Sequence, residues 1–276
     1  MRTRDYPVQE SANPAAASYR QACIDGSFGV AFSEFLFGAD PHQSVAFYPT
    51  ARPARALFAF MHGGGWTNGY KETMGFMAPA FQARGIAFAS VGYRLAPRDV
   101  FPAGAEDCAL AVAELYRRAD TLGFDRSRIF LGGHSSGGHY AALLAVRRDW
   151  QASLGLPVDV VKGCLPISGV YRFGEGSGLS IRPRFLGSDD ADVAAKASPV
   201  LRIDGAPPPF LIAYGDADFP HLRTQPVEMG DALRARGGSV TTILMTARDH
   251  FTASLAGGEE EGPWFPGALR FIEGLL

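Results

Sequence analysis

Arg128-Ile-Phe-Leu-Gly-Gly-His-Ser-Ser-Gly-Gly-His-Tyr-Ala-Ala-Leu-Leu-Ala145 is the stretch from which the fold of this chain is predicted. It combines a short apolar strand, Ile129–Leu131, with a glycine-rich turn and a helix that begins near Gly137. The turn has the pattern Gly-x-Ser-x-Gly, in which glycines permit a sharp reversal and place the serine in a strained conformation. Because the helix start directs backbone N–H groups toward the serine oxygen, the stretch predicts Ser135 as a catalytic nucleophile.

The composition describes an ordinary globular protein and excludes several functions. The 276 residues are 47% hydrophobic and 20% charged, and the net charge of −2 provides no basic surface for nucleic acid. Cys23, Cys108 and Cys164 lie far apart in apolar surroundings, which favours buried free thiols in a reducing compartment. Since no signal-peptide pattern and no apolar run of membrane-spanning length is found, we expect a cytoplasmic protein that does not enter a membrane.

Apolar strands alternate with helices along the chain. This alternation predicts one α/β domain over residues 1–276, built on a mostly parallel sheet that helices cover on both faces. The predicted strands are Val45–Tyr48, Ala56–Met61, Ile86–Val91, Ile129–Leu131, Val160–Ile167, Phe210–Tyr214 and Val240–Met245. The predicted helices are Thr73–Arg84, Ala103–Leu122, the helix after Ser135, Val227–Arg236 and Phe265–Leu275. We expect the first two strands to form an antiparallel pair around the turn at Pro49 and Pro53.

Residues 1–43 form an N-terminal segment of mixed character. Ala15 to Phe37 has helical character and contains an aromatic-rich cluster: Phe28, Phe32, Phe35, Leu36 and Phe37. The cluster either packs on the core, which we favour, or caps a pocket.

A serine nucleophile needs a base, and the base needs an acid that orients it. His250 follows the last predicted strand, at the sheet edge where ligands bind in open α/β folds, and is preferred over His221 as the base. The acid is expected at the end of the preceding strand, where Asp218 and Asp216 both lie. We prefer Asp218 because it precedes Phe-Pro, which would hold it rigidly, and Asp216 remains the alternative.

The negative charge that develops on a substrate oxygen needs fixed donors. The turn Met61-His-Gly-Gly-Gly-Trp66 follows a predicted strand, and its glycines let the backbone approach the substrate. Gly64 and Gly65, with the N–H of Ser136, are therefore the predicted oxyanion donors. His62 is expected to orient this turn by hydrogen bonding and His42 to be exposed to solvent.

These segments resemble the α/β-hydrolase superfamily from about residue 44 to the C-terminus. His62-Gly-Gly-Gly-Trp-Thr-Asn-Gly-Tyr-Lys71 and Gly133–Ala142 are similar to the oxyanion segment and the nucleophile turn of arylformamidases, the kynurenine formamidase-like esterases. Asp218, with Arg223-x-Gln225 after it, and His250-Phe251 also match that family. The third glycine departs from the aromatic residue common in formamidases and is shared with hormone-sensitive-lipase-like esterases. The resemblance implies Ser135 as nucleophile, Asp218 as orienting acid and His250 as base.

The expected activity is hydrolysis of small aryl formamides or carboxylic esters through an acyl-enzyme. The alternatives are a general short-chain carboxylesterase and a non-catalytic ligand-binding member of the fold, which would need a broken triad. No cofactor or metal is expected, since His134 and His139 lack the helical spacing of zinc ligands. Trp66, Phe219 and Phe251 flank the predicted catalytic segments and are expected to line the substrate pocket, with core packing as the alternative. The sequence leaves open whether the chain is a monomer or a homodimer.

Overall fold

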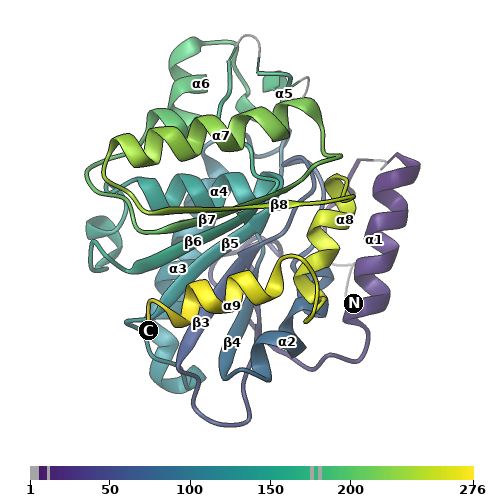
Figure 1. Ribbon diagram of the computed structural model, residues 1–276, viewed down its shortest axis with the longest axis vertical. Helices are drawn as coiled ribbons and strands as arrows, with labels where there is room; N and C mark the ends of the chain where they lie inside the picture. Colours follow the sequence, from purple (N-terminus) through teal and green to yellow (C-terminus); the bar gives the residue numbers. More distant parts are fainter. Residues whose placement is uncertain (1–5, 11–12, 175–176, 180–181) are drawn as a thin grey trace.

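An eight-stranded β-sheet forms the centre of the structure, in the strand order β1-β2-β4-β3-β5-β6-β7-β8 (Figure 1). The computed structural model describes residues 6–10, 13–174, 177–179 and 182–276. β2 is antiparallel to both of its neighbours, and the other neighbouring strands are parallel, which confirms the predicted mostly parallel sheet. The strands are β1 (Ser33–Leu36), β2 (Ser44–Tyr48), β3 (Ala56–Met61), β4 (Ile86–Val91), β5 (Ile129–His134), β6 (Val161–Ile167), β7 (Phe210–Gly215) and β8 (Val240–Met245).

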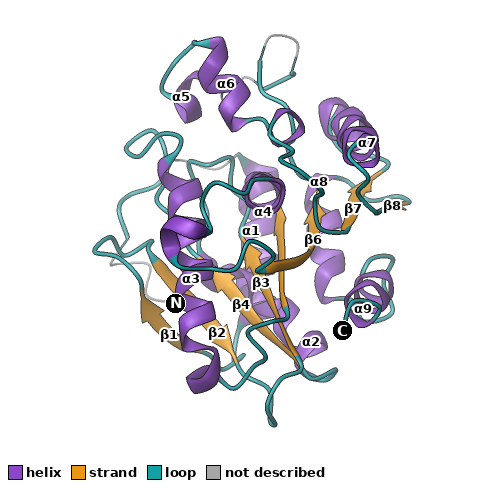
Figure 2. Ribbon diagram, turned by 90° about the vertical axis from the view of Figure 1, so that its left-hand side faces the viewer, coloured by secondary structure: helices purple, strands orange, loops and turns teal. Residues whose placement is uncertain are grey.

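Helices cover both faces of the sheet (Figure 2). One face carries α3 (Ala103–Leu122), α4 (Ser136–Val146) and α7 (Pro220–Ala235). The opposite face carries α1 (Pro14–Ser27), the 3₁₀ helix η2 (Lys71–Met77), α2 (Ala78–Gln82), α8 (His250–Leu255) and α9 (Phe265–Glu273). The short helices α5 (Arg182–Leu186) and α6 (Ala191–Ala197) lie at the top of Figure 1, beyond α7. Three 3₁₀ turns, η3 (Ala152–Leu154), η4 (Pro199–Leu201) and η5 (Ala256–Gly258), complete the described helical segments.

The buried strands have apolar residues on both faces because side chains alternate along a strand. In β3, Leu57 and Met61 pack into the core beneath α3 and α4, whereas Phe58 and Phe60 pack into the opposite core. Phe58 and Phe81 lie with their ring centroids 4.9 Å apart in that second core. Burying side chains of this size stabilises the fold by roughly 1.5–3 kcal/mol each, which is why the central strands are nearly all apolar.

The structure corrects the predicted pairing of the first two strands. β4 lies between β2 and β3, so β2 pairs antiparallel with β4 and β3 pairs parallel with it. The predicted hairpin is wrong because β2 and β3, which the link through Pro49 and Pro53 joins, lie on opposite sides of β4 in the described sheet and both pair with β4.

Three predicted helices also differ in extent. The segment Thr73–Arg84 is divided into η2 and α2, since Pro79 lacks the N–H that would continue a helix from earlier residues. The helical character assigned to Ala15 to Phe37 stops with α1 at Ser27, and β1 follows. α7 begins at Pro220 rather than at Val227, because proline fits the first turn of a helix.

The three cysteines are buried free thiols, as expected. Within the described ranges, no helix is both long enough and apolar enough to cross a membrane.

Candidate active site

Ser135 lies in the turn between β5 and α4, at the carboxyl edge of the parallel strands. Its φ of 55° and ψ of −118° are strained for a residue with a side chain. The flanking glycines are required by close backbone contacts: a Cβ at Gly133 would lie 2.3 Å from the Gly137 backbone, and one at Gly137 would lie 2.1 Å from the Met61 carbonyl oxygen. The N–H of Ser135 donates to the Ile167 carbonyl of β6, which fixes the turn against the sheet.

A hydrogen-bonded chain joins the three predicted catalytic side chains. Nε2 of His250 lies 3.0 Å from Oγ of Ser135, and Nδ1 lies 3.0 Å from Oδ1 of Asp218. His250 begins α8, directly after the turn that follows β8, and Asp218 follows β7. The ends of the parallel strands β5, β7 and β8 therefore bring together the residues predicted as nucleophile, acid and base, which follow one another in that order along the chain.

The structure distinguishes between the two candidate aspartates. Asp218 is 4% exposed and accepts hydrogen bonds from the N–H of Phe219 and from the hydroxyl of Ser168, in addition to its contact with His250. Burial raises the pKa of Asp218, but the attraction and hydrogen bond of His250, with the donors Ser168 and Phe219, outweigh burial and lower that pKa. Asp216 makes no hydrogen bond or ion pair with His250, and its buried Oδ1 has no hydrogen-bond partner among the described residues.

Ser168 is a part of the site that the sequence analysis missed. It follows β6 and has a positive φ of 49°, which directs its hydroxyl to the second oxygen of Asp218. Its only signal in the sequence is its position directly after a buried strand.

The glycine turn after β3 lies beside the nucleophile. Gly64 and Gly65 have φ values of +140° and +61°, and a Cβ at Gly64 would lie 1.9 Å from the Asn68 carbonyl oxygen. The amides of both glycines donate to no carbonyl or side chain in the described ranges, so they are free to meet a substrate oxygen. His62 lies 2.9 Å from the Gly63 carbonyl through Nδ1, in the orienting contact that the sequence predicts.

Three further histidines lie close to the predicted catalytic residues but are not part of the hydrogen-bonded series Ser135–His250–Asp218. Burial lowers the pKa values of His62, His134 and His139 to about 4, 3 and 3, so all three rings are neutral near pH 7. His134 contacts the backbone carbonyl of His250 through Nε2 at 2.9 Å. His139 accepts the indole N–H of Trp66 at 3.1 Å, and its other nitrogen donates to the Ala197 carbonyl at 2.7 Å. No three His, Cys, Asp or Glu side chains in the described part of the chain are grouped to hold a metal ion.

A cavity of about 450 Å³ opens over Ser135 and His250. The three aromatic residues predicted to line it do so, although Trp66 is almost fully buried and stacks on Phe185, whereas Phe219 is 49% exposed. His221 lines the cavity too, next to Phe219. The described lining residues are Asn13, Ala16, Tyr19, Arg20, Gly63, Gly64, Gly65, Trp66, Thr67, Asn68, Gly69, Thr73, Met74, His134, Ser135, Val170, Leu179, Phe219, His221, Leu222, His250 and Phe251.

Part of the N-terminal segment lines this cavity. α1 lies beside α8 in Figure 1, and Tyr19 stacks on Phe251 with ring centroids 5.2 Å apart. The aromatic-rich cluster that the sequence offered as a cap lies elsewhere: Phe28 is 90% exposed, and Phe35 and Phe37 pack against the core. Residues 1–5 and 11–12 of the segment lie outside the described residues.

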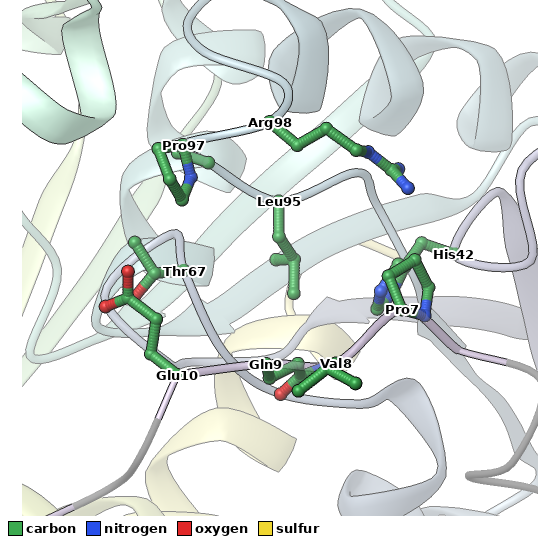
Figure 3. Close-up of a pocket in the computed structure, with 10 residues that line it drawn as sticks. Pro7, Val8, Gln9, Glu10, His42, Thr67, Leu95, Pro97 and Arg98 are labelled. Carbon is green, nitrogen blue, oxygen red and sulfur yellow. The ribbon is translucent and has the colours of Figure 1, made fainter.

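We call residues 6–10 the strap; residues 7–10 line a cavity together with Thr67, which directly follows the glycine turn (Figure 3). The side chain of Gln9 makes two hydrogen bonds with the backbone of Gly69, at 2.8 and 2.9 Å. Tyr6 contacts Lys71 and packs on His42, with ring centroids 4.6 Å apart. His42 is therefore buried, and its predicted exposure is wrong. A cavity of about 130 Å³ lies between the strap and Leu95 (Figure 3).

Comparisons with known proteins agree with this geometry. Residues 47–233 match the family model described as BD-FAE. The esterase LipC of Mycobacterium tuberculosis is 31% identical, and the match covers 94% of this chain and 68% of LipC. The kynurenine formamidase of Danio rerio is 27% identical over 88% of this chain and 79% of its own length. The solved structure of an esterase from Pyrobaculum calidifontis has a TM-score of 0.77 and 20% identity, and covers 95% of this chain and 93% of that esterase.

Proposed function

Because the chain belongs to the BD-FAE family, we propose that it cleaves small carboxylic esters or aryl formamides through Ser135, His250 and Asp218. The chain has the α/β-hydrolase fold and is a hydrolase, since its relatives are named esterases, a carboxylic ester hydrolase and kynurenine formamidases. The observation that carries the proposal for the mechanism is the continuous hydrogen-bonded chain Ser135–His250–Asp218, with 3.0 Å at both contacts of His250.

In the proposed reaction, Oγ of Ser135 attacks the substrate carbonyl carbon while Nε2 of His250 takes the hydroxyl proton. Asp218 accepts the Nδ1–H of His250, which fixes the tautomer and stabilises the imidazolium that forms. The lowered pKa of Asp218 keeps it ionised for this role at neutral pH. Ser168 and the Phe219 N–H hold the carboxylate in place.

The carbonyl oxygen becomes an oxyanion, which we assign to the N–H groups of Gly64, Gly65 and Ser136. The positive φ values of the two glycines turn this backbone into a conformation that residues with a Cβ disfavour. When the tetrahedral intermediate collapses, His250 returns the proton to the leaving alcohol or arylamine, and an acyl group remains on Ser135. A water molecule, activated by His250, then releases the acid and restores the serine.

The cavity supports a substrate with a flat leaving group and a small acyl group. Phe219, Phe251 and Tyr19 form apolar walls near His250, where a ring can stack, and Trp66 limits the space beside the glycine turn. The two relatives above are named for one activity each, an esterase and a kynurenine formamidase. A short-chain carboxylesterase therefore remains the second candidate.

The proposal is tested by activity and by trapping the acyl-enzyme. Wild-type protein is assayed with phenyl acetate and formanilide, and intact mass is recorded after rapid acid quench with phenyl acetate. We expect hydrolysis and an acetyl adduct that maps to Ser135. Ser135→Ala should lower kcat on the order of 10⁴-fold or more, while Ser188→Ala, on a surface loop, should retain wild-type kcat. Turnover by Ser135→Ala close to that of the wild type would contradict the proposed nucleophile.

A further inference from the structure

One side of α1 faces the active-site cavity. Asn13, Ala16 and Arg20 all line it, and their spacing of three and four residues places them on one side of a helix. Tyr19, beside Arg20, reaches further in, because its hydroxyl lies 2.7 Å from Oγ of Ser254 in α8. The guanidinium-bearing side chain of Arg20 therefore belongs to the wall of the cavity.

Arg20 brings a positive charge to a cavity whose lining offers no carboxylate. No Asp, Glu or Lys is among the described residues that line it, and Asp218 lies behind His250, hydrogen-bonded to that ring. Arg20 forms no ion pair with a residue in the described ranges. Arg248, in contrast, lies close to His250 in the sequence and makes two hydrogen bonds to Glu259, at 2.9 and 2.6 Å. A guanidinium without an acidic partner can bind a ligand carboxylate by donating two parallel hydrogen bonds to it.

The position of His250 indicates which part of a substrate would lie beside Arg20. His250 must protonate the leaving group, so that group lies on the His250 side of the cavity. Tyr19 stacks on Phe251, the residue after His250, and Arg20 follows Tyr19 on the same helix. The acyl group lies instead toward the glycine turn and Trp66.

We propose that Arg20 binds a carboxylate on the leaving group, so that the enzyme prefers acidic aryl esters or formamides over neutral ones. The proposal rests on the function proposed above and narrows its substrate class. The aromatic walls hold the ring of the leaving group, and Arg20 selects the charge at its far end.

The test compares two esters with the same ring and the same acetyl group, 4-acetoxybenzoate and 4-acetoxybenzamide. The measured quantity is the ratio of kcat/KM for the anionic ester to kcat/KM for the neutral ester. We expect Arg20→Gln to lower this ratio about 10-fold, and Arg20→Lys to lower it less because the charge remains. Arg52→Gln, an exposed arginine in the loop between β2 and β3, is the matched control and should keep the wild-type ratio.

Two further measurements sharpen the test. Raising the salt concentration should increase KM of wild-type protein for the anionic ester more than for the neutral one, since ions screen the attraction. Arg20→Glu should reverse the preference, so that a cationic ester, 4-acetoxyphenyl-trimethylammonium, becomes the better substrate. Circular dichroism and thermal denaturation confirm that each variant is folded.

The outcomes separate this inference from the proposed function. If wild-type protein hydrolyses both esters and Arg20→Gln leaves the ratio unchanged, the role of Arg20 is overturned and the hydrolase function stands. If neither ester is hydrolysed, the proposed function fails for aryl acetates, and binding decides the role of Arg20. Calorimetry then compares binding of 4-hydroxybenzoate and 4-hydroxybenzamide. If the wild type binds the anion more tightly and Arg20→Gln loses this preference, the carboxylate site is supported. Equal binding of the two compounds by the wild type overturns it.

Discussion

At the scale of single residues, the environment of Asp218 explains how a buried carboxylate can keep its negative charge. Three donors surround its carboxylate: His250, the Ser168 hydroxyl and the Phe219 N–H. A buried carboxylate without such donors would be protonated or would destabilise the fold. Asp216, two residues earlier, has a buried oxygen without a partner in the described structure and does not reach the histidine.

We expect Asp218→Asn to lower kcat by a few orders of magnitude. The amide keeps the shape of the side chain but removes the charge that stabilises the His250 imidazolium, and it can favour the wrong tautomer. Asp216→Asn, the matched control, should lower kcat far less. Steady-state kinetics with phenyl acetate measure both variants, and a larger loss for Asp216→Asn would transfer the role of the acid to Asp216.

At the scale of structural elements, the glycine turn is held from outside by the N-terminal strap. Gln9 bonds to both the N–H and the carbonyl of Gly69, three residues after the glycine turn Met61–Trp66. Lys71 follows, fully buried, with Glu34 at 2.7 Å and Glu72 at 2.8 Å. These contacts fix the turn where glycines alone would leave it free to move.

Gln9→Ala should therefore reduce catalysis more than substrate binding. Without the two hydrogen bonds to Gly69, the donors of the glycine turn are less well placed for the transition state, and we expect kcat to fall about 10-fold while KM changes little. Gln21→Ala is the control, because Gln21 is exposed on α1 and contacts only Asp25 among the described residues. Equal kcat values for the two variants would show that the strap does not position the turn.

The walls of the cavity also predict a limit on the acyl group. Trp66 is fixed by its hydrogen bond to His139 and by stacking on Phe185, 4.4 Å away, so it cannot move aside without breaking both contacts. We therefore expect an octanoyl chain to displace ordered side chains and an acetyl group to be accommodated without displacement. We expect kcat/KM for phenyl esters to fall from acetyl through butyryl to octanoyl. A preference for octanoyl would indicate a long-chain esterase.

At the scale of the whole molecule, four buried histidines make the fold sensitive to acid. Burial lowers the pKa of His42 and of His62 to about 4, and the pKa values of His134 and His139 to about 3. In the unfolded chain a histidine binds its proton near pH 6.5. Between these values the unfolded state holds more protons than the folded state, so the free energy of unfolding decreases as the pH falls.

We expect full stability above about pH 7 and a progressive loss between about pH 6.5 and pH 4. A lowering of one pH unit in a pKa corresponds to ~1.4 kcal/mol, so Tm should fall by about 10 °C or more over this range. Urea denaturation at several pH values measures the slope. His42→Gln should make the slope shallower, since one titrating group is removed, and a flat profile in the wild type would contradict the buried neutral rings.

The local features of the fold and site could be read from the sequence. Glycines at fixed positions around Ser135 specify the sharp turn, because only residues without a Cβ tolerate contacts of 2.1 to 2.3 Å with neighbouring backbone. Apolar runs specify the strands, and the order serine, aspartate, histidine follows from which strand ends share one edge of a parallel sheet. These features depend on neighbours in the chain or on a general rule of topology.

Other features of the fold and the site depend on contacts between distant segments, and only the tertiary structure decided these. The insertion of β4 between β2 and β3, the hydrogen bond of His250 to Asp218, the donor Ser168 and the lining of the cavity by α1 all arise from residues far apart in sequence. The Phe-Pro after Asp218 favours this aspartate but leaves Asp216 as an alternative, because only the folded chain shows which carboxylate meets His250, 32 residues later. The sequence thus determined which reactive side chains are present. Packing determined which of them meet, since hydrogen bonds and burial between distant segments exist only in the folded chain.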